Sequence, residues 1–359
     1  MKIKAIAPGK LILLGEYAVL EGAPAIVMAV NRFAKVTLQT NSSQFNTIRA
    51  PAIGISDLPF TLKKNGKISF HDSIPEEQKE KLRFISSTFE RMAQFYQQNL
   101  SKLPSFKITL NTSQFFNEDD NRKLGLGSSA ALTSALITTL IHFGNPEIKI
   151  EREIDRLFKT TLQAHRQAQG NIGSGIDIAA SIFGGILQYQ IIDIKFSKIP
   201  FHEKLTIPTD LYILIIWTGI SASTKQFVRN IEIFKRKNLA DFENIMKRMT
   251  KISLTGIEAL KQKNTPEFMN TIGEYYSAMK ELGEKSGTPI VSKDHQEIFN
   301  LVANAGGAYK PSGAGGGDLG IAFCDSLKTK DAIFKKIKNT TFKIINLDVA
   351  KKGIQLITQ

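Results

Sequence analysis

The sequence contains a single cysteine and no long apolar run. Cys324 alone cannot form an internal disulfide bond, and this low cysteine content is typical of a reducing compartment, so we expect a cytoplasmic location. The longest clear apolar run, residues 211–217, has seven residues, whereas a membrane-spanning helix needs about 20. The first ten residues, MKIKAIAPGK, include no extended apolar segment like that of a signal peptide. We therefore expect neither secretion nor a membrane partner.

Negative charge is comparatively scarce. The 359 residues include 47 Lys and Arg against 33 Asp and Glu, a formal net charge of +14, which favours anionic partners. Many lysines lie between residues 328 and 352, where they are typical of a solvated helix face. A nucleic-acid surface would mix aromatic and arginine side chains with them, whereas Phe334 and Phe342 are expected in the core. This pattern argues against a nucleic-acid partner, and phosphorylated small molecules are among the other anionic partners that the charge favours.

The length of the chain suggests about two domains of roughly 100–200 residues each. Hydrophobic residues make up 42% of the sequence, which suffices for a sizeable core. A change of composition near 195–210, marked by Lys198, Pro200 and Pro208, predicts a boundary between residues 1–200 and 201–359. Strands are followed by helices in both halves, which favours two α+β units over one doubly wound sheet.

Hydrophobic periodicity predicts the individual elements. Residues 41–80 are expected to form short strands and loops, and 306–317 a glycine-rich loop. A turn is expected at Pro8-Gly9. Strands are expected at residues 3–7, 25–38, 106–110, 212–217, 320–323 and 341–347. Helices are expected at residues 82–98, 128–143, 151–169, 224–236, 240–262, 266–285, 294–305 and 328–338.

The strongest chemical signal is the segment GLGSSAA at residues 125–131. Its two glycines allow the backbone to approach a ligand closely, and Ser128 is a good N-cap for the small-residue helix that follows. The N-terminus of a helix attracts phosphate through its N–H groups and its dipole. The alternative is an ordinary capped helix after a tight turn. The segment lacks the lysine of a P-loop and differs from the dinucleotide-binding GxGxxG pattern.

Two further segments are candidate ligand contacts. Seven of the fifteen residues from 306 to 320 are glycine, and the core of this stretch reads KPSGAGGGD at 310–318. Ordering such a loop is entropically costly, and apolar strand residues follow at once, which argues against a flexible linker. Lys10 follows Pro8-Gly9 and precedes an apolar strand, so it is expected at the edge of a core, although an ordinary surface lysine has the same pattern.

Two more segments combine glycine with hydroxyl or acidic side chains. In GSGIDIAAS, Asp177 lies in the first turn of a small-residue helix, either to complement the helix dipole or to point into a glycine-lined site. In TGISASTK at residues 218–225, a buried strand runs into a hydroxyl-rich turn, which is either an anion cradle or only an N-cap. Neither segment decides between its two interpretations alone.

Together these segments resemble the GHMP kinases, a family of small-molecule kinases. APGKLILLGEYAVLEG is similar to the first motif of that family, GLGSSAA to the second and SGAGGGD to the third. They occur in the family's order and span residues 7–318. The resemblance implies an N-terminal ribosomal-protein-like domain with a left-handed βαβ unit and a ferredoxin-like C-terminal domain, with the active site between them.

Within the family, three features are similar to the phosphomevalonate kinases. These are AQGNIGSGID at residues 168–177, the aspartate Asp318 after the glycines, and TGISASTKQFV at 218–228. Mevalonate kinases carry a Mg²⁺-binding glutamate about eleven residues before the aspartate, and Arg166 stands at that position here. The resemblance implies ATP-dependent phosphorylation of 5-phosphomevalonate to 5-diphosphomevalonate. Mevalonate kinase and mevalonate-diphosphate decarboxylase are the alternatives, and a basic nucleic-acid-binding protein is a remote one.

The resemblance also implies roles for particular residues, with ATP and Mg²⁺ as cofactors and a monomer or homodimer as the assembly. Lys10 and Asp177 would be catalytic. The nucleotide would be bound by the glycine loop and the helix start, Gly125, Leu126, Gly127, Ser128, Ser129 and Ala130, and Ser128 and Ser129 would also contact Mg²⁺. The acid substrate would be bound by Lys10, Lys123, Arg166, Ser174, Gly175, Ser221, Ser223, Thr224, Lys225, Ser312, Gly313, Ala314 and Gly315.

Overall fold

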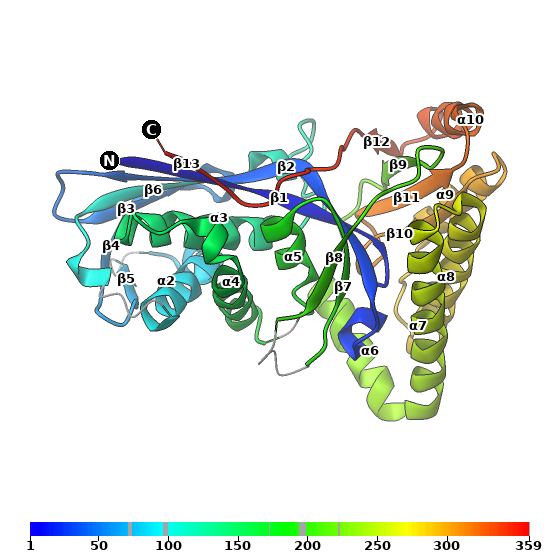
Figure 1. The fold of residues 1–359 in the computed structure, drawn as a ribbon, viewed down its shortest axis with the longest axis horizontal. Helices are drawn as coiled ribbons and strands as arrows, with labels where there is room; N and C mark the ends of the chain where they lie inside the picture. Colours follow the sequence, from blue (N-terminus) through cyan, green and yellow to red (C-terminus); the bar gives the residue numbers. More distant parts are fainter. Residues whose placement is uncertain (71–73, 96–99, 172, 194–198, 222, 359) are drawn as a thin grey trace.

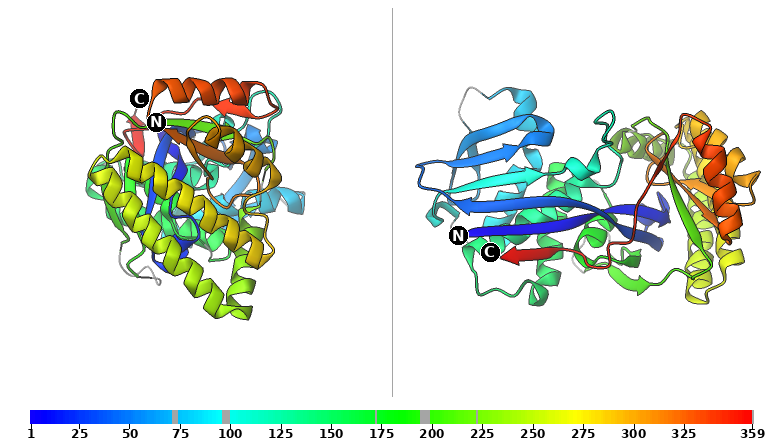
Figure 2. Two further views of the ribbon diagram at one scale, coloured as in Figure 1. Left: turned by 90° about the vertical axis from the view of Figure 1, so that its right-hand side faces the viewer. Right: turned by 90° about the horizontal axis from the view of Figure 1, so that it is seen from above.

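Two β-sheets form the framework of the protein, and helices pack against each (Figures 1 and 2). The computed structural model describes residues 1–70, 74–95, 100–171, 173–193, 199–221 and 223–358. The larger sheet comprises β1 (Lys2–Leu14), β2 (Ala25–Thr40), β3 (Asn46–Ala50), β4 (Ile55–Leu62), β5 (Ile68–Phe70), β6 (Phe106–Asn111), β7 (Ile186–Gln190), β8 (Phe201–Leu205) and β13 (Gln355–Thr358). Its order is β13-β1-β2-β6-β3-β4-β5, with β7 paired to β2 and to β8.

The helices of the first half lie together beneath the larger sheet in Figure 1. They are α1 (Glu76–Lys81), α2 (Arg83–Phe95), α3 (Ser128–Gly144), α4 (Ile154–Ala168) and α5 (Ile176–Phe183). Helix α3 contacts β1 and β2 on one side and α2, α4 and α5 on the other. It is buried on nearly all sides, and small residues such as Ala131 and Ala135 let its neighbours approach closely. This packing fixes the start of α3.

The second sheet has the order β10-β11-β9-β12, formed by β9 (Tyr212–Trp217), β10 (Ala308–Pro311), β11 (Leu319–Cys324) and β12 (Lys343–Ile345). The helices of this half are α6 (Thr224–Lys237), α7 (Leu239–Lys261), α8 (Thr265–Ser286), α9 (Lys293–Ala303) and α10 (Leu327–Lys338). Helices α7 and α8 run side by side in Figure 1 and contact each other along their length. Phe268 of α8 packs edge to face on Phe323 of β11, with ring centroids 5.4 Å apart.

The predicted helices and strands are present, with ends shifted by a few residues. The expected helix 82–98 is described only to Phe95, and residues 96–99 lie outside the described chain. The helix expected from 151 begins at Ile154, after a short 3-10 turn. Strands β7, β8, β10 and β13 were not predicted. Helix α1 was not predicted either, and most of it lies within residues 41–80, where only short strands and loops were expected. Strand β10 lies within the expected loop 306–317, so only residues 306–307 and 312–317 of that segment are irregular.

Two local predictions are wrong. Pro8-Gly9 is not a turn, because both residues lie inside the continuous strand β1. The register shifts opposite them, where Asn31 and Arg32 of β2 have no partner on β1. Phe334 is 44% exposed, whereas Phe342 is buried as expected. Ile333 and Ile337 of α10 are both fully buried and occupy the face that packs on the second sheet, so Phe334 lies off that face.

The two sheets do not follow a simple division of the chain. Strands β8 and β13 both come after residue 200, yet they pair within the larger sheet. The two ends of the chain consequently lie close together in Figure 2, where β13 pairs with β1. The division at residues 200 and 201 stays a prediction, and Lys198, one of its markers, lies outside the described residues. Within the described ranges, no helix has the length and apolar character required to cross a membrane.

Candidate active site

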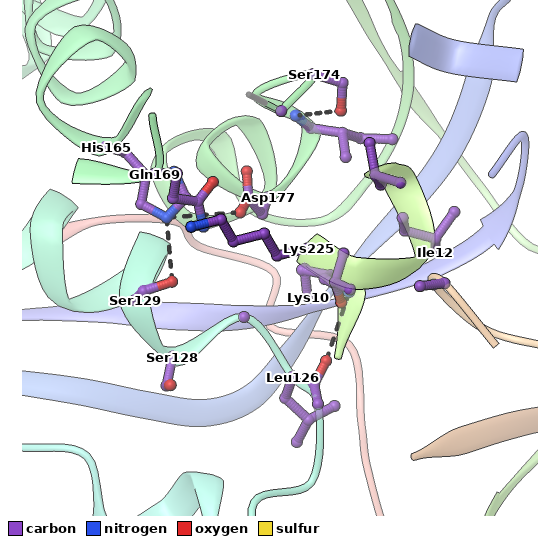
Figure 3. Close-up of a pocket in the computed structure, with 18 of the residues that line it drawn as sticks. Lys10, Ile12, Leu126, Ser128, Ser129, His165, Gln169, Ser174, Asp177 and Lys225 are labelled. Atoms are coloured by element: carbon purple, nitrogen blue, oxygen red, sulfur yellow. Dashed lines mark hydrogen bonds and ion pairs between the residues drawn. The ribbon is translucent and has the colours of Figure 1, made fainter. Parts of the chain in front are cut away.

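A cleft of about 460 Å³ lies where elements of the two halves meet. The first half supplies the second part of β1, the start of α2, the loop before α3 and the segment that connects α4 to α5. The second half supplies the start of α6 and the glycine-rich loop between β10 and β11. All the motifs singled out in the sequence contribute at least one residue to this cleft, part of which is drawn in Figure 3.

Helix α3 begins in the cleft without a capping side chain. Gly127 is the N-cap residue, with φ of 74°, and no side chain accepts a hydrogen bond from the first turn. The expectation that Ser128 caps the helix is therefore wrong, because the left-handed turn at Gly127 starts the helix at Ser128. The first intrahelical bond runs from the amide of Ala131 to the carbonyl of Gly127. The amides of residues 128–130 precede it and have no helical acceptor, as an anion site requires.

The loop before α3 is tightly enclosed. A Cβ atom on Gly125 would lie 2.8 Å from Cγ of Asp318, and one on Gly127 would lie 3.0 Å from Cγ of Lys10. Both glycines also have φ above 70°, which side-chain-bearing residues rarely adopt. Leu126 is buried and anchors the loop in the core. Ala130 is also buried and does not line the cleft, so only its backbone amide remains a candidate nucleotide contact.

Lys10 lies at the junction of the two glycine-rich loops. Its backbone amide donates a hydrogen bond of 2.9 Å to the carbonyl of Leu126, which ties β1 to the loop before α3. Its Nζ lies 3.5 Å from the carbonyl oxygen of Gly125 and 3.7 Å from the Cβ position of Gly313. The adjacent part of β1 is anchored to α5, because Ser181 of α5 donates a hydrogen bond to the carbonyl of Pro8.

Asp177 faces a buried histidine that the sequence analysis did not identify. His165 of α4 lies with Nε2 3.1 Å from Oγ of Ser129 and 3.9 Å from Oδ2 of Asp177 (Figure 3). Burial lowers the pKa of His165 from its ordinary value, although Asp177 acts in the opposite direction, so we treat the imidazole as neutral at pH 7. Asp177 is in the first turn of α5, as predicted, and accepts a hydrogen bond from the amide of Ile178.

Arg166 also lines the cleft, and it shapes the loop before α5. Two of its guanidinium nitrogens donate hydrogen bonds to the carbonyls of Asn171 and Gly173. Ser174 and Gly175 line the cleft beyond that loop. Part of the hydrogen-bonding capacity of Arg166 is therefore used within the protein, while its positive charge stays at the wall of the cleft.

The opposite wall comes from the segment 218–225 and α6. Ser221, Thr224 and Lys225 line the cleft, and Lys123 lies beside them. Figure 3 shows Lys225 extending across the cleft toward Gln169 and Asp177. Ser223 does not line the cleft: its hydroxyl accepts a hydrogen bond from the amide of Gln226 and caps α6. The N-cap interpretation of this serine is therefore confirmed.

The glycine-rich loop 312–318 contributes only part of its length to the cleft. Gly313, Ala314 and Asp318 line it. The hydroxyl of Ser312 instead donates a hydrogen bond of 2.9 Å to the carbonyl of Ile12 and so ties the loop to β1. Gly315 lies away from the cleft against the backbone of Ile290, where a Cβ atom would come within 2.3 Å of a carbonyl oxygen. Ser312 and Gly315 therefore contact other parts of the protein and not the cleft, and they help to hold the loop in place.

A buried histidine, His295, contacts this loop and makes the stability of the folded protein depend on pH. The Nε2 of His295 donates to the carbonyl of Gly317, since that oxygen can only accept, and Nδ1 accepts from the hydroxyl of Tyr309. Burial lowers the pKa of His295 from 6.5 to about 4. The unfolded chain therefore binds a proton at higher pH than the folded protein does, and stability falls as the pH drops from 6.5 to 4.

We expect this single group to remove about 3 kcal/mol of unfolding free energy across that interval. Urea unfolding of the wild type and of His295→Gln at pH 7.5, 5.5 and 4.5 measures the contribution. The variant should lose less stability than the wild type on acidification, whatever its stability at pH 7.5. Equal losses in the two proteins would contradict the assignment.

The cleft is electropositive and has few ligands for a metal of its own. Five Lys and Arg side chains line it (Lys10, Arg83, Lys123, Arg166 and Lys225), against three carboxylates (Glu16, Asp177 and Asp318). Among the described residues, no three or more His, Cys, Asp or Glu side chains group as a metal site. Oxygen ligands for Mg²⁺ are nevertheless available at Ser128, Ser129 and Asp177. A magnesium ion typically takes one or two protein ligands and completes its shell with phosphates and water, and this donor set fits that habit.

Several residues at the cleft besides His165 were not predicted from the sequence. Glu16 and Tyr17, in the first motif, line it, as do Arg83 and Phe84 at the start of α2. Lys310 forms a buried ion pair with Glu16. One signal was present for Glu16: it is the only charged residue between Lys10 and Glu21, inside an apolar stretch, so its burial demanded a partner.

An uncapped helix start, a lysine-rich cleft and two glycine-rich loops are the features of a phosphotransferase that acts on small molecules. Comparison with known families agrees. Residues 86–185 match the family model described as the GHMP kinases N terminal domain, and residues 257–343 match that of the GHMP kinases C terminal region. The chain belongs to the GHMP kinase family, and the expected two-domain α+β fold is confirmed. Members of this family use ATP.

Individual relatives lie in two groups. The chain is 30% identical over 348 residues to the phosphomevalonate kinase of Streptomyces sp. (strain CL190), covering 90% of each. It is 28% identical over 358 residues to the mevalonate kinase of Bos taurus, covering 88% of this chain and 84% of that one. Among solved structures, Streptococcus pneumoniae phosphomevalonate kinase in complex with phosphomevalonate and AMPPNP matches with a TM-score of 0.76 at 20% identity, covering 97% and 99% of the two chains. At that identity, the match supports the fold.

Proposed function

We propose that this protein transfers the γ-phosphoryl group of ATP to 5-phosphomevalonate and forms 5-diphosphomevalonate and ADP. The observation that carries the proposal is the charge of the cleft at Arg166. The resemblance to the mevalonate kinases implies an acid at this position, whereas a cation there suits a substrate that brings its own phosphate. The 30% identity to a phosphomevalonate kinase supports the same choice.

The net charge of the whole cleft also favours a phosphorylated substrate. Among the charged residues that line it, Glu16 is paired with Lys310 and Arg83 with Glu80. The other lining charges are four cations, Lys10, Lys123, Arg166 and Lys225, against the two carboxylates of Asp177 and Asp318. ATP and a phosphorylated acid together bring several negative charges. A single charge-assisted phosphate contact contributes about 1.5–3 kcal/mol, so a neutral alcohol in place of the phosphate would forgo a large part of the binding energy.

On the nucleotide side, the chain contributes backbone donors. The amides of residues 128–130 would bind phosphate oxygens of ATP at the positive end of α3. Ser128 and Ser129, with Asp177, would hold Mg²⁺. When bound, that ion neutralises charge on the β- and γ-phosphates. His165 would keep the Ser129 hydroxyl in place through the hydrogen bond described above.

Lys10 would stabilise the phosphoryl group during transfer. Its ammonium lies beside the carbonyl of Gly125 on the nucleotide side and beside Gly313 on the other, so it lies where the two ligands would meet. In phosphoryl transfer, positioning and charge neutralisation supply most of the rate enhancement. A fixed ammonium at this point supplies both.

Asp177 has a different role with each candidate substrate. A phosphate oxygen of 5-phosphomevalonate would attack the γ-phosphorus while the bond to the β–γ bridging oxygen breaks and ADP leaves. The second pKa of a phosphate monoester is about 6, so this nucleophile is already mostly dianionic at pH 7 and needs no general base. Asp177 would then orient the metal and Lys10. Mevalonate would instead present a neutral hydroxyl, which benefits from a base.

A coupled assay of ADP release tests the proposal directly. The purified protein is assayed with Mg²⁺, ATP and, separately, mevalonate, 5-phosphomevalonate or 5-diphosphomevalonate. We expect kcat/KM for 5-phosphomevalonate to exceed that for mevalonate at least about tenfold, the value of one phosphate contact. A preference for mevalonate would favour mevalonate kinase, the function suggested by the relatives of that name. Turnover of 5-diphosphomevalonate with release of CO₂ and phosphate would favour the decarboxylase.

A further inference from the structure

A fully buried ion pair joins the two sheets beside the cleft. Lys310 of β10 donates a hydrogen bond of 2.5 Å to Oε1 of Glu16, which follows β1, and their side chains are 0% and 1% exposed. Every other ion pair between described residues includes a side chain that is at least 23% exposed, as with His165 and Asp177. The free energy needed to remove two charges from water largely cancels their electrostatic attraction, so a buried ion pair contributes little net stability. Its position suggests another use.

The ion pair is the centre of a group of contacts that fix one segment of the glycine-rich loop. The amide of Gly313 donates to the same carboxylate oxygen of Glu16, at 3.3 Å. Tyr17 donates to the carbonyl of Ala314, and Ser312 donates to the carbonyl of Ile12. Residues 312–314 are therefore held against the end of β1 at three successive positions.

This segment lies between the ion pair and the lysine of the cleft. Gly313 contacts Glu16 through its amide, and its Cβ position is 3.7 Å from Nζ of Lys10. Lys10 and Lys310 are close enough that the charge of Lys10 helps to lower the pKa of Lys310, an effect secondary to burial. The carboxylate of Glu16 offsets the repulsion between these two cations. Its second oxygen, Oε2, is buried with no hydrogen-bond partner among the described residues.

We infer that Glu16 and Lys310 are positioning residues for phosphoryl transfer. The ion pair sets the separation of the two sheets at Gly313, and Gly313 in turn limits where the Lys10 ammonium can lie. The contact of this pair with the reaction is indirect, through the loop. Its kinetic consequence rests on the proposed function, whereas its effect on the loop does not.

The test uses a double variant, Glu16→Gln with Lys310→Met, which removes both charges and keeps similar shapes. Proteins in which a buried ion pair is replaced by uncharged side chains of similar volume often keep their stability. We expect kcat with the preferred acid to fall about 10–100-fold, because a shift of the Lys10 ammonium by about 1 Å can cost that much. KM for ATP should stay within about threefold of the wild-type value, because the variant does not alter α3. Hydrogen exchange of the amides in 312–317 should accelerate about tenfold, as a local opening without global unfolding would produce.

A matched control pair lies away from the cleft. Lys285 and Asp241 form an ion pair of 2.8 Å between α8 and α7, and both side chains are exposed. The double variant Asp241→Asn with Lys285→Met should keep both kcat and the exchange of 312–317. If the Glu16/Lys310 double variant fails to fold, Glu16→Asp replaces it: the charge stays, the side chain is one methylene shorter, and the same two changes are expected with smaller size.

The inference is overturned if the folded variant keeps kcat within twofold of the wild type, or if exchange in 312–317 is unchanged. Either result would mean that the pair only fills space between the sheets. Failure of the proposed function looks different, because the wild type itself would then turn over none of the three acids. The exchange measurement alone would in that case still decide whether Glu16 and Lys310 position the loop.

Discussion

Replacing Lys10 with methionine is expected to lower kcat for phosphoryl transfer by about 10²–10³-fold, the cost of removing one preorganised charge donor from a transition state. Methionine keeps the aliphatic stem that packs beside Gly127 but removes the ammonium between the two loops. KM for ATP should change much less, because the amides of 128–130 still bind phosphate. Steady-state ADP release, with thermal unfolding as a check of the fold, measures both.

Lys4→Met is the matched control for this experiment. Lys4 lies on the same strand, is partly buried as Lys10 is, and is remote from the cleft lining. It should retain the wild-type kcat. If Lys10→Met kept half or more of the wild-type kcat, the proposed position of the transferred phosphoryl group beside Lys10 would be wrong.

Asp177→Asn is expected to lower kcat by about 10–150-fold, equivalent to one charge-assisted contact, without changing the shape of the pH–rate profile. If the nucleophile is a phosphate dianion, it needs no base, so the variant should show no new basic limb between pH 7 and 9. Loss of a general base would instead make the rate of the variant rise with pH as the substrate ionises on its own. Such a new limb would contradict our account of Asp177.

The control for this variant is Asp155→Asn. Asp155 is the second residue of α4, as Asp177 is of α5, so both changes remove an acid from the first turn of a helix. Asp155 is exposed and does not line the cleft. Its substitution measures the effect on the helix dipole alone, which is expected to be small at an exposed site. A comparable fall in kcat for Asp155→Asn would show that loss of an acid from the start of a helix is enough to lower kcat, and that Asp177 has no special role in the cleft.

The parts of the site that could be predicted from the sequence are those formed by residues close together in the chain. The glycines before α3 and the start of that helix follow from residues adjacent in the chain, and the family motifs supply their relation to Lys10. The cap was nevertheless misassigned, because a serine in this position favours capping by propensity. The left-handed conformation of Gly127 overrides that preference, and a Cβ atom at this position would also lie only 3.0 Å from Cγ of Lys10.

The residues that were missed depend on contacts between distant parts of the chain. His165 lies on an amphipathic helix, where a lone histidine is usually a core residue, and only the fold brings it to Ser129. Glu16 and Lys310 are 294 positions apart, so no local pattern could pair them. Strand β13 has only four residues, too few for a clear periodicity, and it is stabilised by pairing with β1, which is a tertiary contact. Sequence therefore predicted the motifs, while the partners that hold them in place required the structure.

The central claim is that the uncapped amides at the start of α3 bind the triphosphate of ATP. A crystal structure of the protein with a non-hydrolysable ATP analogue and Mg²⁺ tests it most directly. Our account predicts phosphate oxygens within hydrogen-bonding distance of the amides of residues 128–130, with the Lys10 ammonium next to the γ-phosphate. A nucleotide bound elsewhere, with these amides left in contact with solvent or a protein side chain, would contradict it.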